Sequence, residues 1–272
     1  MIAEATRIIQ ECSAIFIGAG AGIGVDSGLP DFRSNNGFWK HYPLYERLGL
    51  NFYKLANPQL FIDDPRLAWG FYYHRSILYK KTNPHYGFDI LKKWTEKTNH
   101  DYFIYTSNVD QQFQKAGFDQ DKLIEIHGNI YRLQCSKNCN ENNFRFTTNV
   151  DLDYSTMRLM GDLPFCSRCG TIVRPNVLMF GDKYFNRDHV ISQYSRYNKW
   201  LKSLKDKKIA ILEIGAGSQI PSVRIECETL SKSIDIPNIR INLNECGTDS
   251  HTICLKMKSI EALTELDKLI GE

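Results

Sequence analysis

The sequence is short of the features that mark membrane, secreted and nucleic-acid-binding proteins. No stretch approaches the run of about 18 apolar residues that a membrane-spanning helix requires, and residues 1–11 carry charges in place of the apolar core of a signal peptide. The formal net charge is only +3, whereas a nucleic-acid-binding domain carries clustered Lys and Arg. We therefore expect a cytoplasmic protein that has neither a membrane nor a nucleic acid as a direct partner.

The chain also lacks internal repeats and low-complexity tracts, and its 272 residues suffice for one large domain with a small satellite module. Short apolar runs alternate with helical patterns, which predicts an α/β fold with a Rossmann-like, mainly parallel sheet. The expected strands lie at 14–17, 102–105, 123–126, 177–180, 209–214 and 239–243, and helices are expected at 3–12, over much of 44–97 and at 259–270.

Three regions differ in composition and in predicted secondary structure. Residues 40–97 are predicted to form a helical insertion. The polar, Asn-rich residues 135–170 are predicted to form a small zinc-binding module that has little apolar core of its own. The remaining segments, 1–39, 98–134 and 171–272, are predicted to form the Rossmann-like, nucleotide-binding domain.

Four of the eight cysteines form two close pairs. Cys135 and Cys139 are separated by three residues, and Cys166 and Cys169 by two. Such pairs let two loops supply four thiolates to one tetrahedral ion, and four thiolates leave no open position for chemistry. We therefore expect one structural Zn²⁺ at these residues. The other cysteines, at 12, 227, 246 and 254, are scattered, and we expect them to be reduced, buried thiols.

A glycine-rich loop follows the first predicted strand. Glycines stand at positions 18, 20, 22 and 24, and small residues let the backbone approach a pyrophosphate, whose charge the amides of a following helix can hold. The spacing does not match the fingerprint G-x-G-x-x-G, so a plain turn remains open as the alternative. Residues 26–34 then combine a Gly-Leu-Pro turn with Phe32 and Arg33, an apolar face and a fixed cation.

Several blocks of this sequence resemble the sirtuins, the NAD-dependent protein deacylases. Residues 20–23 and 28–33 resemble the family's NAD loop. Residues 106–110, Thr-Ser-Asn-Val-Asp, are similar to its Thr-Gln-Asn-Ile-Asp, and residues 126–128, Ile-His-Gly, to its catalytic His-Gly. Residues 174–182 resemble its substrate-binding strand. The blocks occur in the family's order along nearly the whole chain, with the cysteine module in the expected place.

The resemblance implies that NAD is a co-substrate. In the family the first loop covers NAD and its Phe shields the reactive ribose carbon, a role that falls to Phe32. The second glycine site at 215–218 and the end of the strand at 239–243 are expected to meet the phosphates and the adenosine, although plain turns remain open there. The expected cofactor-binding residues are Gly18, Ala19, Gly20, Ala21, Gly22, Ile23, Asp31, Phe32, Arg33, Ser107, Asn108, Val109, Asp110, Gly215, Ala216, Ser218, Asn242, Leu243 and Asn244.

Three polar residues follow two of the predicted strands and are the expected catalytic residues. Asn108 and Asp110 come after 102–105, and His127 comes after 123–126. The carboxyl ends of parallel strands are where α/β sheets bind ligands, and a neutral imidazole is suited to take a proton from a sugar hydroxyl. The other histidines, at 41, 74, 85, 100, 189 and 251, lack such a context and are expected to be structural.

The resemblance also implies a mechanism. The acyl oxygen of the substrate lysine attacks the ribose carbon as nicotinamide leaves, and Asp110 holds the nicotinamide carboxamide. His127 deprotonates a ribose hydroxyl that attacks the acyl carbon, while Asn108 positions the ribose and a water. Water then releases free lysine and O-acyl-ADP-ribose.

The expected substrate is an acyl-lysine side chain of a protein or peptide. Tyr72 and Arg75 are three residues apart in a predicted helix, which puts them on one face, where a phenol and a guanidinium can grip a carboxylate. This pair resembles the Tyr-x-x-Arg with which some sirtuins recognise succinyl or malonyl lysine; a local pair in a deacetylase is the alternative. By resemblance, the residues that pair with the peptide backbone as an added strand are Val177, Phe180, Gly181 and Asp182.

The sequence departs from the family pattern at three places near the expected cofactor. Gly24 stands where many members have Ser, Ser107 replaces Gln, and residues 215–218, Gly-Ala-Gly-Ser, replace Gly-Thr-Ser. These departures keep two rival activities open on the same fold, NAD hydrolysis and mono-ADP-ribosyl transfer. A non-catalytic NAD-sensing module is a third alternative, which the polar residues at the two strand ends disfavour.

Overall fold

The computed structural model describes residues 1–30, 38, 40, 42–139, 144, 150–247 and 250–271. The chain forms two compact units. Unit 1 comprises Met1–Leu29, Asn83–Ile126 and Val190–Glu272, and unit 2 comprises Pro30–Thr82 and His127–His189. Each unit therefore draws on segments far apart in the sequence, and the division into a Rossmann-like domain, a helical insertion and a zinc module stays a prediction.

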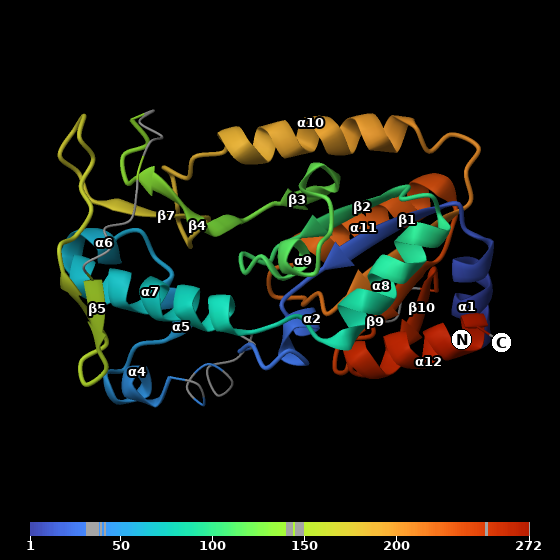
Figure 1. The fold of residues 1–272 in the computed structure, drawn as a ribbon, viewed down its shortest axis with the longest axis horizontal. Helices are drawn as coiled ribbons and strands as arrows, with labels where there is room; N and C mark the ends of the chain where they lie inside the picture. Colours follow the sequence, from blue (N-terminus) through green and yellow to red (C-terminus); the bar gives the residue numbers. More distant parts are fainter. Residues whose placement is uncertain are drawn as a thin grey trace. The chain divides into compact units, whose positions relative to one another are not determined.

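Unit 1 is built on a six-stranded parallel sheet with the order β10–β9–β8–β1–β2–β3 (Figure 1). β2 and β3 lie on one side of β1, and β8, β9 and β10 lie on the other. The loops that follow β1 and β8 therefore meet at the topological switch point, where α/β sheets bind their ligands. The strands are β1 (Ala14–Ala19), β2 (Tyr102–Thr106), β3 (Leu123–Glu125), β8 (Ile209–Ile214), β9 (Asn238–Ile241) and β10 (Thr252–Leu255).

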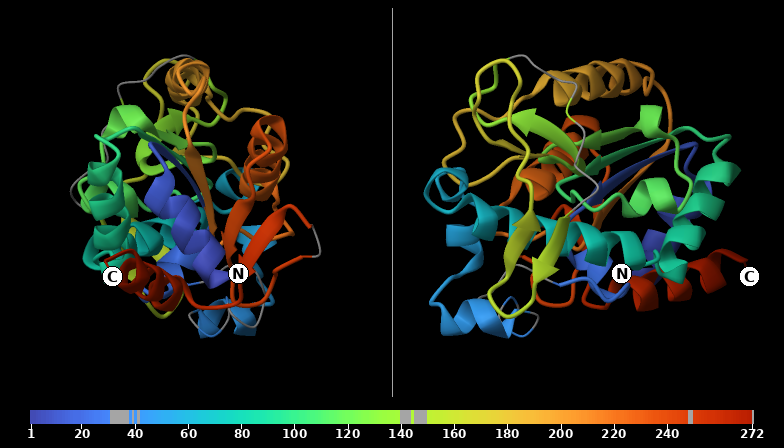
Figure 2. Two further views of the ribbon diagram at one scale, coloured as in Figure 1. Left: turned by 90° about the vertical axis from the view of Figure 1, so that its right-hand side faces the viewer. Right: turned by 60° about the vertical axis from the view of Figure 1, so that its left-hand side comes forward.

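Helices cover both faces of this sheet. Ile15 and Ile17 of β1 join a core with buried residues of α1, α8 and α12. On the other face the Phe16 ring packs against Tyr197 of α10, with centroids 5.8 Å apart, and α11 contacts β1 and β8. Figure 2 shows α1 and α12 side by side near the two ends of the chain. The helices are α1 (Ile2–Glu11), α2 (Gly22–Val25), α8 (Tyr86–Lys97), α9 (Gln112–Lys115), the 3-10 helix η1 (Gln120–Lys122), α10 (Asp188–Lys202), α11 (Ser222–Ile234) and α12 (Ser259–Gly271).

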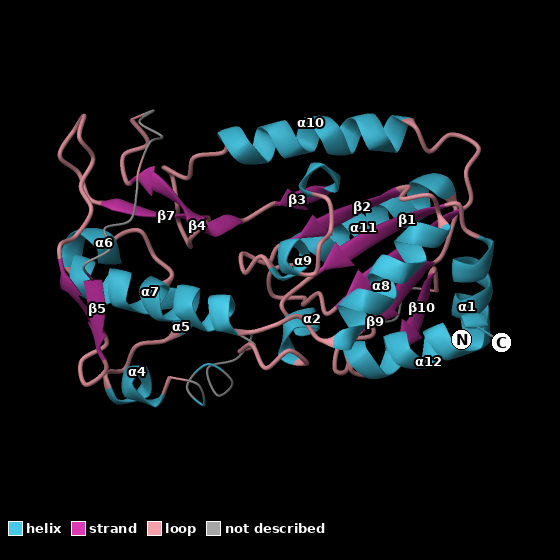
Figure 3. Ribbon diagram, in the orientation of Figure 1, coloured by secondary structure: helices cyan, strands magenta, loops and turns pink. Residues whose placement is uncertain are grey.

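Unit 2 has only small antiparallel strand pairs among its described residues, β4 with β7 and β5 with β6, beside its helices (Figure 3). Its longest helix, α7, begins sharply because Asp64 accepts a hydrogen bond from Leu67 N and Pro65 occupies the first position. The named elements are α4 (Pro43–Arg47), α5 (Phe52–Leu55), α6 (Leu60–Asp63), α7 (Pro65–Lys81), β4 (Gly128–Cys135), β5 (Val150–Asp153), β6 (Arg158–Gly161) and β7 (Val173–Val177).

Aromatic rings fill much of unit 2. We call five of them the aromatic cluster; neighbouring rings have centroids 5.0 to 6.2 Å apart. Ring pairs at such distances add to the area that they bury. The members are Phe38, Tyr42, Tyr45, Phe52 and Phe71.

The structure confirms the α/β fold and the parallel sheet but corrects several strand predictions. The strand expected at 177–180 lies earlier, at Val173–Val177, because its buried residues Arg174 and Asn176 are polar and do not form an apolar run. Pro175 is tolerated there because it pairs with an irregular part of β4 in a two-stranded sheet. The pattern also fails to predict β4, β5, β6 and β10.

No helix in the described ranges combines the length and the apolar composition that crossing a bilayer would demand.

Candidate active site

The loops after β1 and β8 contact each other through glycine backbones. Gly20 N donates to Ile214 O at 2.9 Å, and Gly22 N donates to Gly215 O at 3.0 Å. A Cβ on Gly20 would lie 2.6 Å from Gly215 O, and a Cβ on Gly215, whose φ is +62°, would lie 2.4 Å from Ile23 N. Glycine is therefore required at 20 and 215 by the close approach of two backbones at the switch point.

Asn108 is fixed against the first of these loops. Its Nδ2 donates to Gly20 O at 3.1 Å, and its backbone N–H donates to Thr106 Oγ1 at 3.0 Å. Thr106 Oγ1 donates in turn to Ala19 O at 2.8 Å. Asp110 is buried two residues further on, and its Oδ1 accepts a backbone N–H at 2.9 Å. The structure thus brings the predicted block at 107–110 to the predicted glycine loop.

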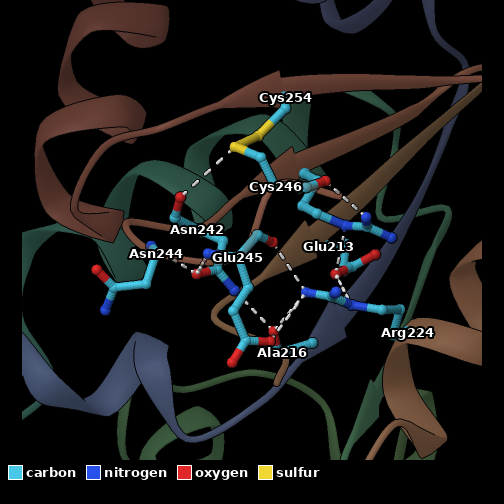
Figure 4. Close-up of a disulfide and its surroundings, with 9 residues drawn as sticks. Glu213, Ala216, Arg224, Asn242, Asn244, Glu245, Cys246 and Cys254 are labelled. Atoms are coloured by element: carbon cyan, nitrogen blue, oxygen red, sulfur yellow. Dashed lines mark hydrogen bonds and ion pairs between the residues drawn. A yellow bond between two sulfur atoms is a disulfide. The ribbon is translucent and has the colours of Figure 1, made fainter. Parts of the chain in front are cut away.

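The loops after β8 and β9 are also joined. Asn242 Nδ2 donates to Ala216 O at 2.7 Å, and Asn242 Oδ1 accepts hydrogen bonds from the backbone N–H groups of Asn244 and Glu245 at 3.1 and 3.0 Å. The Glu245 carboxylate accepts a hydrogen bond from Ser218 N at 2.7 Å. Figure 4 shows Asn242 and Glu245 directed toward Ala216. The second glycine site and the end of β9 therefore form one hydrogen-bonded group, and their contact with the cofactor stays a prediction.

A buried ion cluster that was not predicted from the sequence lies beside these loops. Glu213 of β8 is fully buried, and its Oε1 lies 2.8 Å from Arg240 Nε and 3.3 Å from Arg224 Nε. Arg224 Nη2 also donates to Ala216 O and Glu245 O at 3.1 and 3.0 Å (Figure 4), so this cation bridges the two loops. The available signal is a glutamate within the apolar run of the strand.

Two of the scattered cysteines are bonded to each other. A disulfide joins Cys246, which follows the turn at 242–245, to Cys254 of β10 (Figure 4). The parallel pairing of β9 and β10 brings their Cα atoms to 5.6 Å, within the usual range for a disulfide. This corrects the expectation that the scattered cysteines are all reduced thiols, which holds for Cys12 and Cys227.

His85 supports the first glycine loop, a contact that the sequence analysis did not predict. Its Nδ1 accepts a hydrogen bond from Gly87 N at 3.0 Å, which leaves Nε2 as the donor to Ile23 O at 3.0 Å. Its backbone N–H donates to Ser27 Oγ at 3.0 Å. Burial lowers the pKa of His85, because the charged form is poorly solvated there. The neutral imidazole thus holds the residues around α2.

The predicted NAD-site residues that the structure describes all belong to unit 1. Three further predicted residues, Asp31, Phe32 and Arg33, lie outside the described residues. Those described are at 18–23, 107–110, 215, 216, 218 and 242–244.

In unit 2, His127 is joined to the segment predicted to bind substrate. His127 O accepts a hydrogen bond from Leu178 N at 2.9 Å. The next residue, Gly128, has φ +79°, and a Cβ there would lie 2.1 Å from Asn176 O of β7. The glycine of the His-Gly motif is therefore explained by the close passage of β7. His127 itself is half-buried.

The side chain of Asp182 forms a buried ion pair. Both carboxylate oxygens accept hydrogen bonds from Arg174 Nη2, at 2.8 and 2.7 Å, and both side chains are fully buried. Arg174 Nη1 also donates to Val177 O at 3.2 Å. The pair therefore connects β7 to the far end of the turn that carries Phe180 and Gly181, two of the residues predicted to meet the substrate backbone.

Tyr72 and Arg75 are neighbours on α7, as their spacing predicts. Arg75 is 4% exposed, and its Cζ lies 5.5 Å from the Tyr72 ring centroid. Phe71, Phe52 and Tyr79 present their rings to the same Cζ at 5.2, 5.7 and 5.4 Å. The Tyr72 hydroxyl is buried and has no hydrogen-bond partner among the described residues, and burial raises the pKa of Tyr72 to about 12. An orphaned hydroxyl beside a cation is a place where an anionic ligand would be stabilised.

The four paired cysteines converge, as their spacing predicts. Their Sγ atoms all lie within 4.8 Å of one another, and the closest pairs, Cys135–Cys169 and Cys139–Cys166, are 3.4 Å apart. A Zn–S bond of about 2.3 Å in a tetrahedron places sulfurs about 3.8 Å apart. The four thiols therefore fit a zinc ion after small shifts, and all four positions of its shell would be filled.

Comparison with known proteins assigns this geometry to a family. Residues 20–202 match the Sir2 family model. The chain belongs to the Sir2 family. The NAD-dependent protein deacylase of Pyrococcus furiosus is 34% identical over 184 residues, which cover 67% of this chain and 66% of that protein. The NAD-dependent protein deacylase of Aquifex aeolicus is 36% identical over 163 residues, 60% of this chain and 59% of that protein. The chain thus matches about two thirds or less of the length of these relatives.

Solved structures show the Sir2 fold over nearly all of the chain. A Sir2 homologue in complex with NAD has a TM-score of 0.71 at 23% identity, covering 99% of this chain and 93% of that one. A Sir2 protein with a deacetylated p53 peptide and 3'-O-acetyl ADP ribose has a TM-score of 0.69 at 22% identity, covering 98% of each. The residues of this Sir2-family chain fit an NAD molecule, because glycine backbones and buried side-chain amides lie together at the topological switch point of its sheet.

Proposed function

We propose that this Sir2-family chain is an NAD-dependent protein lysine deacylase that transfers the acyl group of a modified lysine to ADP-ribose. The names of its relatives support this activity. So do the hydrogen-bonded loops of unit 1 and the contact between His127 and the segment after β7 in unit 2. The observation that carries the proposal is the backbone hydrogen bond between His127 and Leu178, because it joins an ionisable imidazole to a segment suited to binding a peptide.

NAD supplies the ribose that accepts the acyl group, and nicotinamide is its leaving group. In unit 1, the glycine loop and residues 215–218 would hold the phosphates, and Asn242 to Asn244 the adenosine. Asn108, held by Gly20 O, would orient the ribose, and Asp110 would accept a hydrogen bond from the nicotinamide carboxamide. The ribose and nicotinamide roles fall to two buried polar side chains, Asn108 and Asp110, which suit preorganised contacts.

In unit 2, His127 would take the proton of a ribose hydroxyl as that oxygen attacks the acyl carbon. The backbone of 177–181 would pair with the peptide as an added strand, which leaves the Asp182 carboxylate to hold the turn through Arg174. A zinc ion at the four cysteines would take no part in the reaction, because its shell would have no open position.

The products test this proposal directly. Wild-type protein with NAD and an acetyl-lysine peptide should release nicotinamide, free lysine and O-acetyl-ADP-ribose, which mass spectrometry distinguishes from ADP-ribose. His127→Ala should lose this activity by a factor of about 10² to 10⁴, the usual contribution of a general base. The exposed His100→Ala is the matched control and should be unchanged. A folded His127→Ala protein with full turnover would rule out the assigned base.

NAD hydrolysis is the second candidate. The observation that favours it is Gly24, where a Cβ would lie 3.2 Å from Leu29 Cδ1, so the serine common in the family is replaced at a tight position. If free ADP-ribose forms at the same rate with and without an acyl peptide, the chain is an NAD hydrolase. If the ADP-ribose is found on protein, it is a mono-ADP-ribosyltransferase.

We further propose that the acyl group is acidic, succinyl or malonyl. This choice is supported by the buried Tyr72 hydroxyl, which lacks a hydrogen bond to any described residue, and by the Arg75 guanidinium beside the Tyr72 ring. Arg75→Met should lower the ratio of desuccinylation to deacetylation of one peptide by more than about tenfold, the size of a lost charge-assisted hydrogen bond. An unchanged ratio would indicate a pocket for acetyl or for longer neutral chains.

A further inference from the structure

The guanidinium of Arg75 is oriented by a residue one turn further along α7. Tyr79 lies four positions after Arg75, so the two side chains share a helix face. The Tyr79 hydroxyl oxygen accepts hydrogen bonds from Arg75 Nε at 3.1 Å and from Nη2 at 2.7 Å. These two bonds turn the edge of the guanidinium that carries Nε and Nη2 toward Tyr79, and the rings packed 5.2 to 5.7 Å from Cζ limit its remaining rotation.

We infer that Tyr79 is a positioning residue for acyl recognition: it aims the Arg75 guanidinium at the terminal carboxylate of a succinyl or malonyl lysine. The inference rests on the acidic-acyl activity proposed above. It adds to that proposal a residue outside the Tyr-x-x-Arg pair and a reason why Arg75 holds one orientation.

The chemistry of a phenol suits this task. A phenol accepts hydrogen bonds without a negative charge, so Tyr79 orients the cation without neutralising it. The rings of Phe71 and Tyr72, at 5.2 and 5.5 Å from Arg75 Cζ, hold a cation through their faces and likewise add no anion. The contacts with Tyr79, Phe71 and Tyr72 bring no negative charge to Arg75, and a charged guanidinium attracts a carboxylate.

The hydroxyl groups of Tyr79 and Tyr72 have different roles beside Arg75. Tyr79 accepts a hydrogen bond from Arg75, whereas the buried Tyr72 hydroxyl has no hydrogen-bond partner within the part of the chain that the structure describes. A buried hydroxyl without a hydrogen bond destabilises the folded protein. A ligand carboxylate would accept a hydrogen bond from this hydroxyl and another from the guanidinium, so one ligand group would contact both residues.

The aromatic cluster links this site to the segment proposed to bind the peptide. The Phe52 ring lies 5.7 Å from Arg75 Cζ and contacts the Phe180 ring edge-on, with centroids 6.0 Å apart. Phe180 N donates to Ala56 O at 2.9 Å, at the end of α5. All of these contacts are within unit 2, so the orientation of Arg75 is tied to the turn after β7 through packed side chains.

The test compares two peptides that differ only at the end of the acyl chain. Succinyl-lysine ends in a carboxylate, and pentanoyl-lysine has a similar length and no charge. Tyr79→Phe should lower kcat/KM for the succinyl peptide roughly tenfold, mainly through KM, and should leave the pentanoyl value unchanged. Tyr131→Phe is the matched control, because it removes a phenol that donates to Ser76 O of the same helix.

A double-mutant cycle with Arg75→Met separates positioning from general support. If Tyr79 acts through Arg75, the double variant should be no worse on succinyl-lysine than Arg75→Met alone. Additive losses, or equal losses on both peptides, would overturn the inference and make Tyr79 a packing residue. The pentanoyl rate of the same preparation reports how much folded enzyme is present.

The same data distinguish failure of this inference from failure of the proposed activity. A wild-type enzyme whose succinyl-to-pentanoyl ratio is low and insensitive to Arg75→Met would overturn the acidic-acyl proposal and the role of Tyr79 with it. A high ratio that depends on Arg75 and is insensitive to Tyr79→Phe would overturn the role of Tyr79 alone.

Discussion

The two units of this chain are stabilised in different ways. Unit 1 has a parallel sheet whose central strands, such as Ala14–Ala19 and Ile209–Ile214, are buried along their whole length between layers of helices. Unit 2 has a small core around its four paired cysteines. Among the described residues, the buried members of this core are two of those cysteines and Val173. In place of a sheet core it uses the aromatic cluster and a buried ion pair.

This difference has consequences for binding. Unit 1 can present glycine backbones to a ligand, because the glycine loops directly follow the buried strands β1 and β8 and are held in place by them. Unit 2 carries His127 and the segment proposed to bind the peptide on short elements, which depend on side-chain contacts to hold their positions. We therefore expect perturbations of the cysteine site and of the ion pair to act mainly on peptide handling, whereas perturbations around the glycine loops act on NAD.

Removal of zinc should have the largest effect. Chelation should abolish order in the segments around β4 and β7, because four thiolates would then replace a metal centre that is worth about 10 kcal/mol or more in small zinc domains. Hydrogen exchange measured segment by segment should rise there and change little in β1, β2 and β8. Elemental analysis should find one zinc per chain.

The matched pair of variants for this test is Cys135→Ser and Cys12→Ser. The first removes a predicted ligand and should reproduce the effect of chelation, whereas the second changes a free, half-buried thiol in unit 1. A uniform rise of exchange in both units, or full order without metal, would contradict a zinc that supports unit 2.

Breaking the buried ion pair should have the next largest effect. Asp182→Asn leaves the Arg174 cation buried without its partner charge, which typically costs about 3 to 5 kcal/mol. The thermal midpoint should fall, and the KM for peptide should rise more than the KM for NAD, because the pair holds the turn at 178–181. Asp121→Asn is the control, since its ion pair with Arg196 is exposed and worth about 1 kcal/mol or less. Equal changes in the two variants would remove the distinction between the units.

Much of this fold is predictable from periodicity because unit 1 follows simple rules. An apolar run that is buried on both faces predicts a parallel strand, and β1, β2 and β8 lie within two residues of where such runs occur. The four cysteines converge as their spacing indicates, and the spacing of Tyr72 and Arg75 indicates their shared place on α7. In each case the signal is local along the chain.

The features that were not predictable depend on contacts between distant segments. β7 contains buried polar residues that only its partners explain: Asn176 Nδ2 donates to Gln134 Oε1 at 2.8 Å. Cys246 and Cys254 can be paired only once β9 and β10 are known to be adjacent. Glu213 is an outlier in its strand, and its arginine partners come from later elements. Such contacts carry no periodic pattern.

The smallest expected effect is a pH dependence of NAD binding through His85. Burial holds the pKa of this imidazole below its usual value of 6.5 in the folded protein, so the unfolded chain takes up the proton first as the pH falls. The stability that the neutral imidazole contributes is therefore complete above about pH 6.5 and is lost progressively below it. Protonation of Nδ1 would also end its role as the acceptor for Gly87 N, and the bond from Nε2 to Ile23 O would then no longer be held in one orientation.

We expect the KM for NAD to rise as the pH falls from about 6.5 to about 5, by a few-fold more in wild type than in His85→Gln, whose amide can donate to Ile23 O but does not titrate. His74→Gln provides the comparison from unit 2, because burial also lowers the pKa of His74, yet its ring contacts Tyr42 and not the glycine loop. The measurement is a pH profile of the KM for NAD at saturating peptide for the three proteins. The prediction fails if the pH profiles of wild type and His85→Gln coincide and only that of His74→Gln is flatter. The acid sensitivity would then come from the aromatic cluster of unit 2 and not from the glycine loop of unit 1.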